Sequence, residues 1–363
     1  MIVNRRMLVS FDWLWFLSLL LLSAAGLTAI WSTTQGTGIS YYLGRQIVYL
    51  CLSLVIFLVL LYFDYHAYTD FSTVAYVGGL VLLVLVLVIG RTVHNNKSWL
   101  GLGTLSFQPS ELIKVLVILS LAKYYAATDR DHLELSELGV GALIAMAPMA
   151  LVILQGDLGT AVTFLPIYVG LTFLAGLKRK HIVVLLIVAA ILLPAGWMML
   201  KDYHKGRIQT VLNPSNDPRG LGYQPQQSKI AIGSGRFLGK GFKQGTQGQL
   251  GFLPARHTDF VFAVLSEERG FVGSLSLLAL FLFVALRLLR AGRQAKDKVG
   301  SLVVMGVWSL FLFHVVVNAG MVMGLLPIAG IPLPFVSAGG SSLLTFFIAM
   351  SLSMNVSMRR FVN

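Results

Sequence analysis

Ten apolar stretches, each close to the length of about 20 residues that an α-helix needs to cross a bilayer, set the first limit on how this chain can fold. A water-soluble domain would be about a quarter charged, whereas 12% of these 363 residues are charged and 56% are hydrophobic. Soluble enzymes, coiled coils, disordered chains and disulfide scaffolds are therefore excluded. The sequence predicts an all-α polytopic membrane protein with about ten transmembrane helices, in which 1–363 form a single membrane domain. The stretches run roughly over 11–31, 46–63, 71–90, 110–127, 138–155, 160–177, 181–200, 270–289, 301–322 and 341–358.

The distribution of Lys and Arg predicts how these helices are oriented. An even number of spans places both termini on one side, and cytoplasmic loops carry an excess of Lys and Arg. With both termini cytoplasmic, the inner loops and tails hold fourteen basic residues, including Arg5, Arg6 and Arg130, and the short outer loops hold three. We therefore expect both termini in the cytoplasm and one large outer loop, about 201–258, between the seventh and eighth spans. The first stretch lacks a small-residue cleavage site, which favours an uncleaved span over a signal peptide.

The predicted outer loop is basic for its side of the membrane. Nine of the 28 Lys and Arg residues lie in it, among them Lys201, Arg219, Lys229 and Lys240. A loop of this length can cross regardless of its charge, so the orientation stands. Two interpretations are open: a solvated loop that touches anionic headgroups, or a cradle for an anionic substrate.

Glycines crowd the second half of this loop, between Gly233 and Gly251, and alternate with Arg236, Lys240 and Lys243. Glycine lets backbone amides approach phosphate oxygens, and the cations add charge. The order Gly-x-Gly-x-x-x-Gly matches neither of the common nucleotide-binding fingerprints and no strand precedes it, so nucleotide binding is not expected. Flexible tight turns are the plain interpretation. A phosphate-bearing lipid is the substrate class that would explain glycine, lysine and membrane position together.

Charged side chains inside membrane helices are costly and are therefore candidates for function. Glu111 and Lys114 stand three residues apart at the start of the fourth stretch, so they share one helix face. They form either an ion pair that staples the bundle or the polar floor of a water-filled cavity, with Lys114 available to an anion. Asp157 lies in a tight link and is predicted to cap the helix that follows it. The carboxylates in or beside such segments are Glu111, Asp157, Asp259, Glu267 and Glu268.

Asp259 lies where the basic loop gives way to an apolar stretch that returns to the membrane. A carboxylate at such a boundary, beside low dielectric, His257 and Arg256, is placed to have a shifted pKa and to act as a general base. The pair Thr258-Asp259 is also a good helix start, so an N-cap is an equal alternative. His257 and Asp259 could share a cation, but two ligands are too few to define a metal site.

The last outer loop, 326–342, is uncharged and carries three prolines followed by paired glycines. This pattern favours irregular backbone at membrane depth, which is tolerated only where protein or water covers it. We therefore expect the loop, which contains Ser337, to line a cavity.

A series of motifs gives the chain a resemblance to the SEDS family (shape, elongation, division and sporulation) over nearly its whole length, and to the elongation branch more than the division branch. The chain departs from the family pattern at Gly156, where Pro is usual, and at Ala338, where Tyr is usual. The motifs are Phe-Gln-Pro-Ser-Glu at 107–111, Gln-x-Asp-Leu-Gly-Thr at 155–160, Ser-Lys-Ile-Ala-Ile-Gly-Ser-Gly at 228–235, Gly-Thr-Gln at 245–247, Leu-Gly-Phe-Leu-Pro at 250–254, His-Thr-Asp-Phe at 257–260 and Pro-Phe-Val-Ser at 334–337.

The resemblance implies a ten-helix peptidoglycan glycosyltransferase of the bacterial plasma membrane. Such an enzyme polymerises lipid II into β-1,4-linked glycan at the outer face, for cell elongation and rod shape, and releases undecaprenyl pyrophosphate. Asp259 matches its catalytic residue, and Glu111 and Lys114 match residues of its central cavity. The implied partners are a class B penicillin-binding protein transpeptidase and other membrane proteins of the elongation complex, with lipid II as substrate and no nucleic acid. Further substrate-binding candidates, in or beside the shared motifs, are Asp157, Lys229, Lys240, His257 and Ser337.

One carboxylate suffices for this chemistry, because a pyrophosphate leaving group needs no acid partner when cations hold it. Arg, Lys or a divalent cation would supply that charge, and no other cofactor is expected. Two other classes stay open. A flippase or transporter of a lipid-linked precursor would also keep ionisable groups at depth, whereas a scaffold for the cell-wall machinery would leave the acids and the basic loop unexplained.

Overall fold

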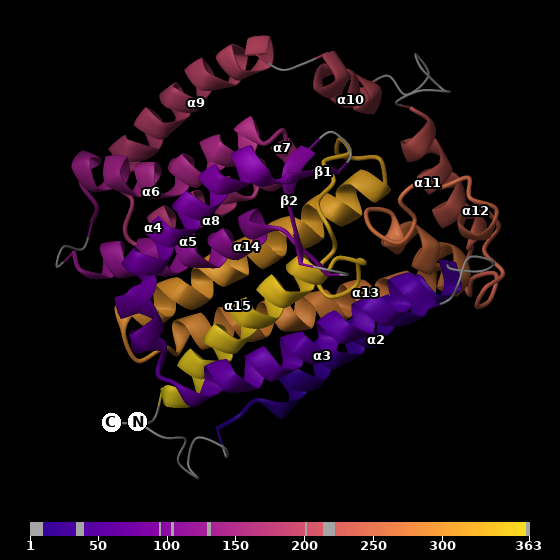
Figure 1. The fold of residues 1–363 in the computed structure, drawn as a ribbon, viewed down its shortest axis with the longest axis horizontal. Coiled ribbons are helices and arrows are strands. Elements are labelled where there is room, and N and C mark those ends of the chain that lie inside the picture. The colour runs from indigo at the N-terminus through magenta and orange to yellow at the C-terminus, as the bar shows by residue number, and fades with distance from the viewer. Residues whose placement is uncertain are drawn as a thin grey trace.

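The computed structural model describes most of the chain as helix (Figure 1). The basic residues Arg5, Arg6, Arg130, Lys201 and Arg219 lie outside the described residues. The described residues are 10–33, 40–93, 96–102, 105–128, 132–199, 202–212 and 222–360.

Each of the ten apolar stretches contains a helix. Seven of the described helices are long and apolar enough to cross a membrane: α2, α3, α4, α6, α13, α14 and α15. The helices of the fourth, sixth and seventh stretches are not among these seven. The helix α5 carries three charged residues, Glu111, Lys114 and Lys123, and the sixth stretch is divided between α7 and α8. The number of ten spans therefore stays a prediction. The bounds are α2 (Trp13–Thr33), α3 (Ser40–Tyr62), α4 (Tyr65–Ile89), α5 (Pro109–Ala126), α6 (Leu135–Leu154), α7 (Leu158–Val162), α8 (Phe164–Leu174), α9 (Arg179–Met199), α13 (Val261–Arg293), α14 (Lys298–Val322) and α15 (Gly340–Arg359).

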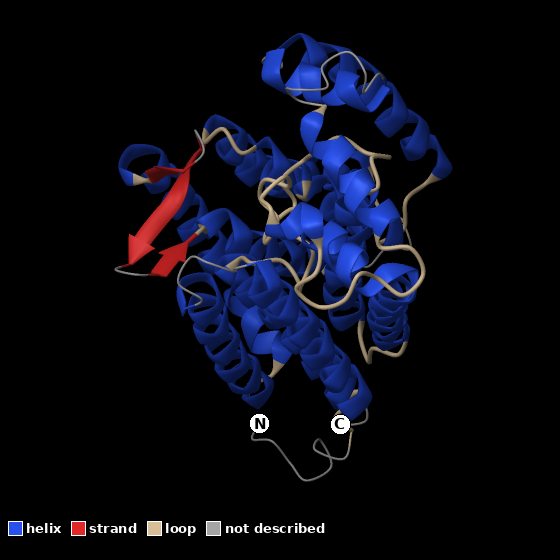
Figure 2. Ribbon diagram, turned by 90° about the vertical axis from the view of Figure 1, so that its right-hand side faces the viewer, coloured by secondary structure: helices blue, strands red, loops and turns tan. Residues whose placement is uncertain are grey.

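Three short strands precede α5 and were not predicted. They are β1 (Arg91–Val93), β2 (Asn96–Leu102) and β3 (Leu105–Phe107), paired antiparallel in that order (Figure 2). The link between α4 and α5 is too polar to continue either helix, and its Thr, Val, Trp and Phe residues suit strands. The backbone N–H of Lys97 donates to the carbonyl of Gln155 (3.0 Å), which ties the sheet to the start of the α7 turn.

The predicted outer loop contains three helices, α10 (Asp202–Leu212), α11 (Tyr223–Ser234) and α12 (Thr246–Gln249). In Figure 1, α9 and α10 lie at the edge of the molecule, apart from the main bundle. By contrast, α11 packs against α13 and α14, and the hydroxyl of Ser228 donates to the carbonyl of Val322 (2.7 Å) at the end of α14. The second half of this segment is therefore fixed to the central helices.

The centre of the bundle is built from α14 and α15. Most residues of both helices are buried, polar ones included. The helix α15 packs along α3, and α14 packs along α13, α8 and α5. Polar groups on these two helices therefore face protein, where each needs a partner.

The helix α13 is broken at Gly270, which has φ 65° and ψ −161°. Only glycine adopts this conformation readily. The amide groups freed by the break are satisfied from the glycine-rich segment: Phe271 donates to the carbonyl of Arg236 (2.9 Å) and Val272 to that of Phe237 (3.1 Å). The predicted start of this span at residue 270 coincides with the break, and the short first part of α13 leads directly from Asp259.

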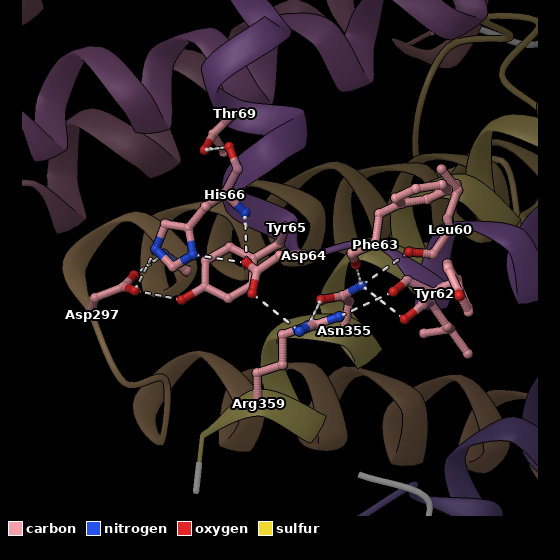
Figure 3. Close-up of polar contacts among 12 residues, drawn as sticks. Leu60, Tyr62, Phe63, Asp64, Tyr65, His66, Thr69, Asp297, Asn355 and Arg359 are labelled. Carbon is pink, nitrogen blue, oxygen red and sulfur yellow. Dashed lines mark hydrogen bonds and ion pairs between the residues drawn. The ribbon is translucent and has the colours of Figure 1, made fainter. Parts of the chain in front are cut away.

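A polar cluster joins the ends of α3 and α15 to the starts of α4 and α14 at the opposite end of the bundle (Figure 3). Asp64 contacts Arg359 of α15 (Oδ2 to Nη1, 3.1 Å), and His66 lies between Asp64 (2.8 Å) and Asp297 (3.0 Å). Asn355 donates to the carbonyls of Leu60 (2.9 Å) and Phe63 (2.6 Å), which end α3. Burial raises the pKa of Asp64, but the hydrogen bonds from His66 and the charge of Arg359 outweigh it and hold that pKa below its usual range.

Candidate functional site

A buried ion pair and a histidine form a polar group inside the bundle. Lys114 Nζ lies 2.8 Å from Glu111 Oε1, and these side chains are 0% and 4% exposed. The same ammonium lies 3.5 Å from Nε2 of His314 on α14. The second carboxylate oxygen of Glu111 is buried and has no hydrogen-bond partner among the described residues. The ion pair is thus present, and beside it an oxygen remains that can still accept a hydrogen bond.

The other side of His314 reaches the last outer loop. Its Nδ1 lies 3.0 Å from the carbonyl oxygen of Pro332. Because a carbonyl oxygen only accepts, Nδ1 carries the proton and Nε2 faces Lys114 as an acceptor. One helical turn later, Nδ2 of Asn318 donates to the carbonyls of Ile331 (2.8 Å) and Asp259 (3.1 Å). Through these two residues of α14, the Glu111–Lys114 pair is linked to the backbone of Asp259.

The last outer loop is also bonded directly to the turn that carries Asp259. The hydroxyl of Ser337 accepts from the N–H of Leu333 (2.8 Å) and donates to the carbonyl of Thr258 (2.6 Å). The N–H of Ala338 donates to the carbonyl of His257 (2.8 Å). A side chain of one carbon placed on Gly330 would lie 3.9 Å from Oδ2 of Asp259. Ser337 therefore binds the backbone of Thr258, Ala338 binds that of His257, and Gly330 of the loop lies beside the Asp259 carboxylate.

Asp259 lies one residue before the N-cap position of α13, which is Phe260, and the Phe260 side chain makes no cap hydrogen bond. The Asp259 side chain is half-buried at the start of this helix. The assignment of Asp259 as a general base rather than a helix cap therefore stays a prediction.

His257 packs its ring against Tyr42 of α3, with 4.6 Å between the ring centroids. Burial, and secondly the positive charge of Arg256, lower the pKa of His257 below its ordinary value. His257 is therefore neutral at neutral pH and can bind a substrate by hydrogen bonding but not by charge.

Asp157 is the predicted helix cap. Its carboxylate accepts from the backbone N–H (3.0 Å) and the hydroxyl (2.8 Å) of Thr160, and from the amide of Gln108 (2.7 Å). These three bonds use both oxygens of Asp157. They join the turn before α7 to the start of α5, near Glu111.

The glycine-rich segment already surrounds carboxylates of the protein itself. Glu267, fully buried, accepts from Lys240 Nζ (2.7 Å) and from the N–H groups of Gln247 (3.1 Å) and Gly248 (3.3 Å). Glu268 accepts from the N–H of Lys243 (3.1 Å). The backbone amides and the Lys240 ammonium that suggested a phosphate cradle therefore already bind two carboxylates of α13.

The remaining cations of the outer segment take separate positions. Lys229 is exposed on α11, with its side chain lying over Gly324. Arg207 donates to the carbonyl of Ile328 (3.0 Å), and Arg256 to that of Gly248. Within the described ranges, no three His, Cys, Asp or Glu side chains are grouped so that they could hold a metal ion.

Comparison with known proteins places this arrangement in a family. The family model for FtsW, RodA and SpoVE, described as cell cycle protein, matches residues 5–361. The chain belongs to this family. The SEDS resemblance read from the motifs is therefore confirmed.

Curated relatives in the FtsW, RodA and SpoVE family carry enzyme names. Peptidoglycan glycosyltransferase MrdB of Escherichia coli K12 is 38% identical over 348 residues, 95% of this chain and 92% of that protein. Peptidoglycan glycosyltransferase RodA of Treponema pallidum is 34% identical and covers 96% of this chain and 98% of its own. These relatives confirm, at the level of the family, the prediction of a glycosyltransferase. They also confirm the prediction of a multi-pass protein of the inner membrane.

Two solved structures of the family share the fold. A chain from a peptidoglycan synthase complex, in which polymerization and crosslinking are coordinated, has 31% identity and a TM-score of 0.83, and the match covers 97% of this chain and 99% of that chain. The rod shape determining protein RodA of Thermus thermophilus has 28% identity and a TM-score of 0.73, over 97% and 98% of the two chains.

Sequence reasoning on this member of the family missed His314 and Asn318. Both residues are uncharged and lie inside the apolar stretch 301–322, four residues apart on one helix face. A buried polar side chain within a membrane helix indicates a functional position, as a charged one does, but less strongly. Their contacts across 18 and 13 residues to Pro332 and Ile331 depend on the path of the last loop, which no spacing rule gives.

Proposed function

We propose that this protein is a peptidoglycan glycosyltransferase that polymerises lipid II into β-1,4-linked glycan strands at the outer face of the plasma membrane, with Asp259 as general base. The observation that carries the proposal is the way Asp259 is held. Its backbone is bonded to Asn318 of α14, its neighbours Thr258 and His257 are bonded to the last outer loop, and its side chain is half-buried at the start of α13. Such preorganisation suits a residue that acts in a reaction.

The reaction needs one proton acceptor and one stabilised leaving group. The 4-hydroxyl of an acceptor sugar attacks the anomeric carbon of a lipid-linked donor, and its proton passes to the Asp259 carboxylate. The bond from the anomeric carbon to the phosphate oxygen breaks, and undecaprenyl pyrophosphate leaves with the electron pair. A single direct displacement inverts the anomeric centre and gives the β-linkage.

Lys229 is a better candidate than Lys240 for the charge that holds the pyrophosphate. Lys240 is committed to Glu267 and Thr246, at 2.7 and 2.8 Å, and these contacts would have to break to release it. Lys229 is exposed on α11, which is anchored to the end of α14. A solvent-facing ammonium loses less on binding a phosphate, because no existing ion pair is given up.

The proposed partner is a class B penicillin-binding protein transpeptidase, together with other membrane proteins of the elongation complex. The similarity to a chain of a peptidoglycan synthase complex supports this partner. An outer-facing active site is required by the position of such a transpeptidase and agrees with the orientation that the basic inner loops predict.

The deciding experiment is lipid II polymerisation by purified full-length protein with its transpeptidase partner, in detergent. We expect Asp259→Asn to abolish glycan formation while expression and partner binding remain. The matched control is Asp70→Asn, which removes an exposed carboxylate at another place in the chain. Product of near-normal length and rate from Asp259→Asn would refute the base assignment. Failure of the unaltered protein to make glycan without a membrane to cross would favour the flippase alternative.

A further inference from the structure

One face of α3 lies against the last outer loop and the turn before α13. Tyr42, Gln46 and Tyr49 follow one another at helical spacing, so they share this face. The ring of Tyr42 packs on His257, with 4.6 Å between the centroids. Tyr49 covers the start of α15, where a Cβ on Gly340 would lie 2.2 Å from its ring. Gln46 lies between these two contacts and is buried, with 5% of its surface exposed.

The side-chain amide of Gln46 bonds the backbone of the last outer loop where that loop becomes α15. Its Oε1 accepts from the N–H of Gly339 (3.2 Å), and its Nε2 donates to the carbonyl of Ser337 (3.4 Å). Because an N–H only donates and a carbonyl oxygen only accepts, the two contacts decide which way the amide is turned. Gln46 thus satisfies two backbone groups of opposite kind, one residue apart from each other.

The segment 337–339 is also bonded to the turn that carries Asp259. The N–H of Ala338, between the two groups that Gln46 binds, donates to the carbonyl of His257 (2.8 Å). The hydroxyl of Ser337 donates to the carbonyl of Thr258 (2.6 Å). Consecutive residues of the segment therefore bond in alternation to α3 and to 257–258, and a displacement of the segment from α3 also moves its bonds to the turn.

We propose that Gln46 is a positioning residue for Asp259, which it holds in place through 337–339 and 257–258. This inference rests on the function proposed above. Without the amide, the N–H of Gly339 and the carbonyl of Ser337 lose their partner, and the segment has to shift to find others. A general base has to lie within hydrogen-bond reach of the hydroxyl that it deprotonates. A misplacement of about 1 Å can therefore slow such a reaction by about a hundredfold.

The competing explanation is that Gln46 only fastens α3 to α15, which pack along each other. A matched control exists for this role, because Ser351 makes a buried bond between the same two helices, deeper in the bundle. Its hydroxyl donates to the carbonyl of Phe57 (2.7 Å). Ser351→Ala removes a contact of the helix pair and leaves the last outer loop untouched, whereas Gln46→Met removes the contact to the loop at a similar side-chain length.

The first test is the kinetics of lipid II polymerisation by purified full-length protein with its transpeptidase partner, in detergent. We expect Gln46→Met to lower the maximal rate by about tenfold or more, with the lipid II concentration for half-maximal rate unchanged. Ser351→Ala should keep the maximal rate, even where its thermal stability falls. A normal maximal rate for Gln46→Met, a change confined to the half-maximal concentration, or parallel losses of rate and stability in both variants would each overturn the proposal.

A second measurement, hydrogen–deuterium exchange followed by mass spectrometry, does not depend on activity. We expect Gln46→Met to speed exchange in the peptides that contain 337–339 and 257–259, and Ser351→Ala to speed it in neither. Faster exchange at 337–339 alone would show that the turn is held independently and would refute the positioning role. Where the unaltered protein makes no glycan, the proposed function fails, while the exchange still decides whether Gln46 holds the turn. Gln46→Asn, whose amide is one methylene too short for both contacts, replaces Gln46→Met in both tests if that variant does not fold.

Discussion

The side-chain amide of Asn318 lies 3.1 Å from the backbone carbonyl oxygen of Asp259 and 2.8 Å from that of Ile331. One buried amide group thereby joins a central helix, the turn before α13 and the last outer loop. In the proposed reaction Asn318 acts through the backbone of Asp259 and is a positioning residue.

We predict that Asn318→Asp lowers the rate of lipid II polymerisation by about tenfold or more, because the substituted side chain cannot donate and faces two carbonyl oxygens. The loss should fall on the maximal rate, with the lipid II concentration for half-maximal rate little changed, since substrate contacts remain. The control is Asn355→Asp, which removes a comparable amide donor to the carbonyls of Leu60 and Phe63 at the far end of the bundle. Equal loss of activity in both variants would mean that Asn318 matters for stability alone.

Substitutions of Glu111 and Lys114 should have non-additive effects on the stability of the protein. Lys114→Met leaves a buried carboxylate without its cation, and we expect this to cost about 3–5 kcal/mol. The double variant Glu111→Gln/Lys114→Met should be more stable than Lys114→Met alone, because it leaves no unpaired charge. Thermal unfolding in detergent measures both. A strictly additive double variant would contradict direct pairing and would point to separate partners for the two groups.

Much of the fold could be predicted because bilayer length and hydrophobicity act on each helix alone. All ten apolar stretches contain helices, and the span predicted to begin at residue 270 meets the break of α13 at Gly270. The cap at Asp157 is equally local, since a carboxylate three residues before Thr160 finds its amide without help from the rest of the chain. The strands β1 to β3 were missed because short polar links give weak signals and depend on tertiary partners.

The site could be predicted only in part, because its residues meet through contacts across long stretches of sequence. The approach of Asp259 to Asn318 spans 59 residues, and that of Lys114 to His314 spans 200. In the glycine-rich segment, composition predicted a binding site whose groups are already bound to the protein itself. Its composition suits a phosphate cradle, yet the anions that its amides meet are Glu267 and Glu268, which composition could not place beside it.

Loss of the Lys229 side chain should weaken substrate binding, whereas loss of the Lys240 side chain should weaken the local structure. We expect Lys229→Ala to raise the lipid II concentration needed for half-maximal polymerisation, since it removes a charge proposed to hold the pyrophosphate. Lys240→Ala should instead loosen 240–248, because Glu267 loses its cation, and should be seen as faster proteolysis of that segment. Polymerisation kinetics and limited proteolysis of both variants separate the two effects. The same kinetic change in both, with no change in proteolysis, would contradict the distinction.

His257 should make the protein less stable in acid. Burial and Arg256 lower the pKa of His257 below its ordinary value of 6.5, so the unfolded chain takes up this proton more readily than the folded protein. Stability is therefore unaffected above about pH 6.5 and falls as the pH drops below that value, until the folded pKa is passed. We expect His257→Gln to lose less thermal stability than the unaltered protein between pH 7.5 and about pH 5. The control His132→Gln alters an exposed histidine and should leave the acid response unchanged; an acid response of His257→Gln identical to that of the unaltered protein would show that His257 is not held neutral by its site.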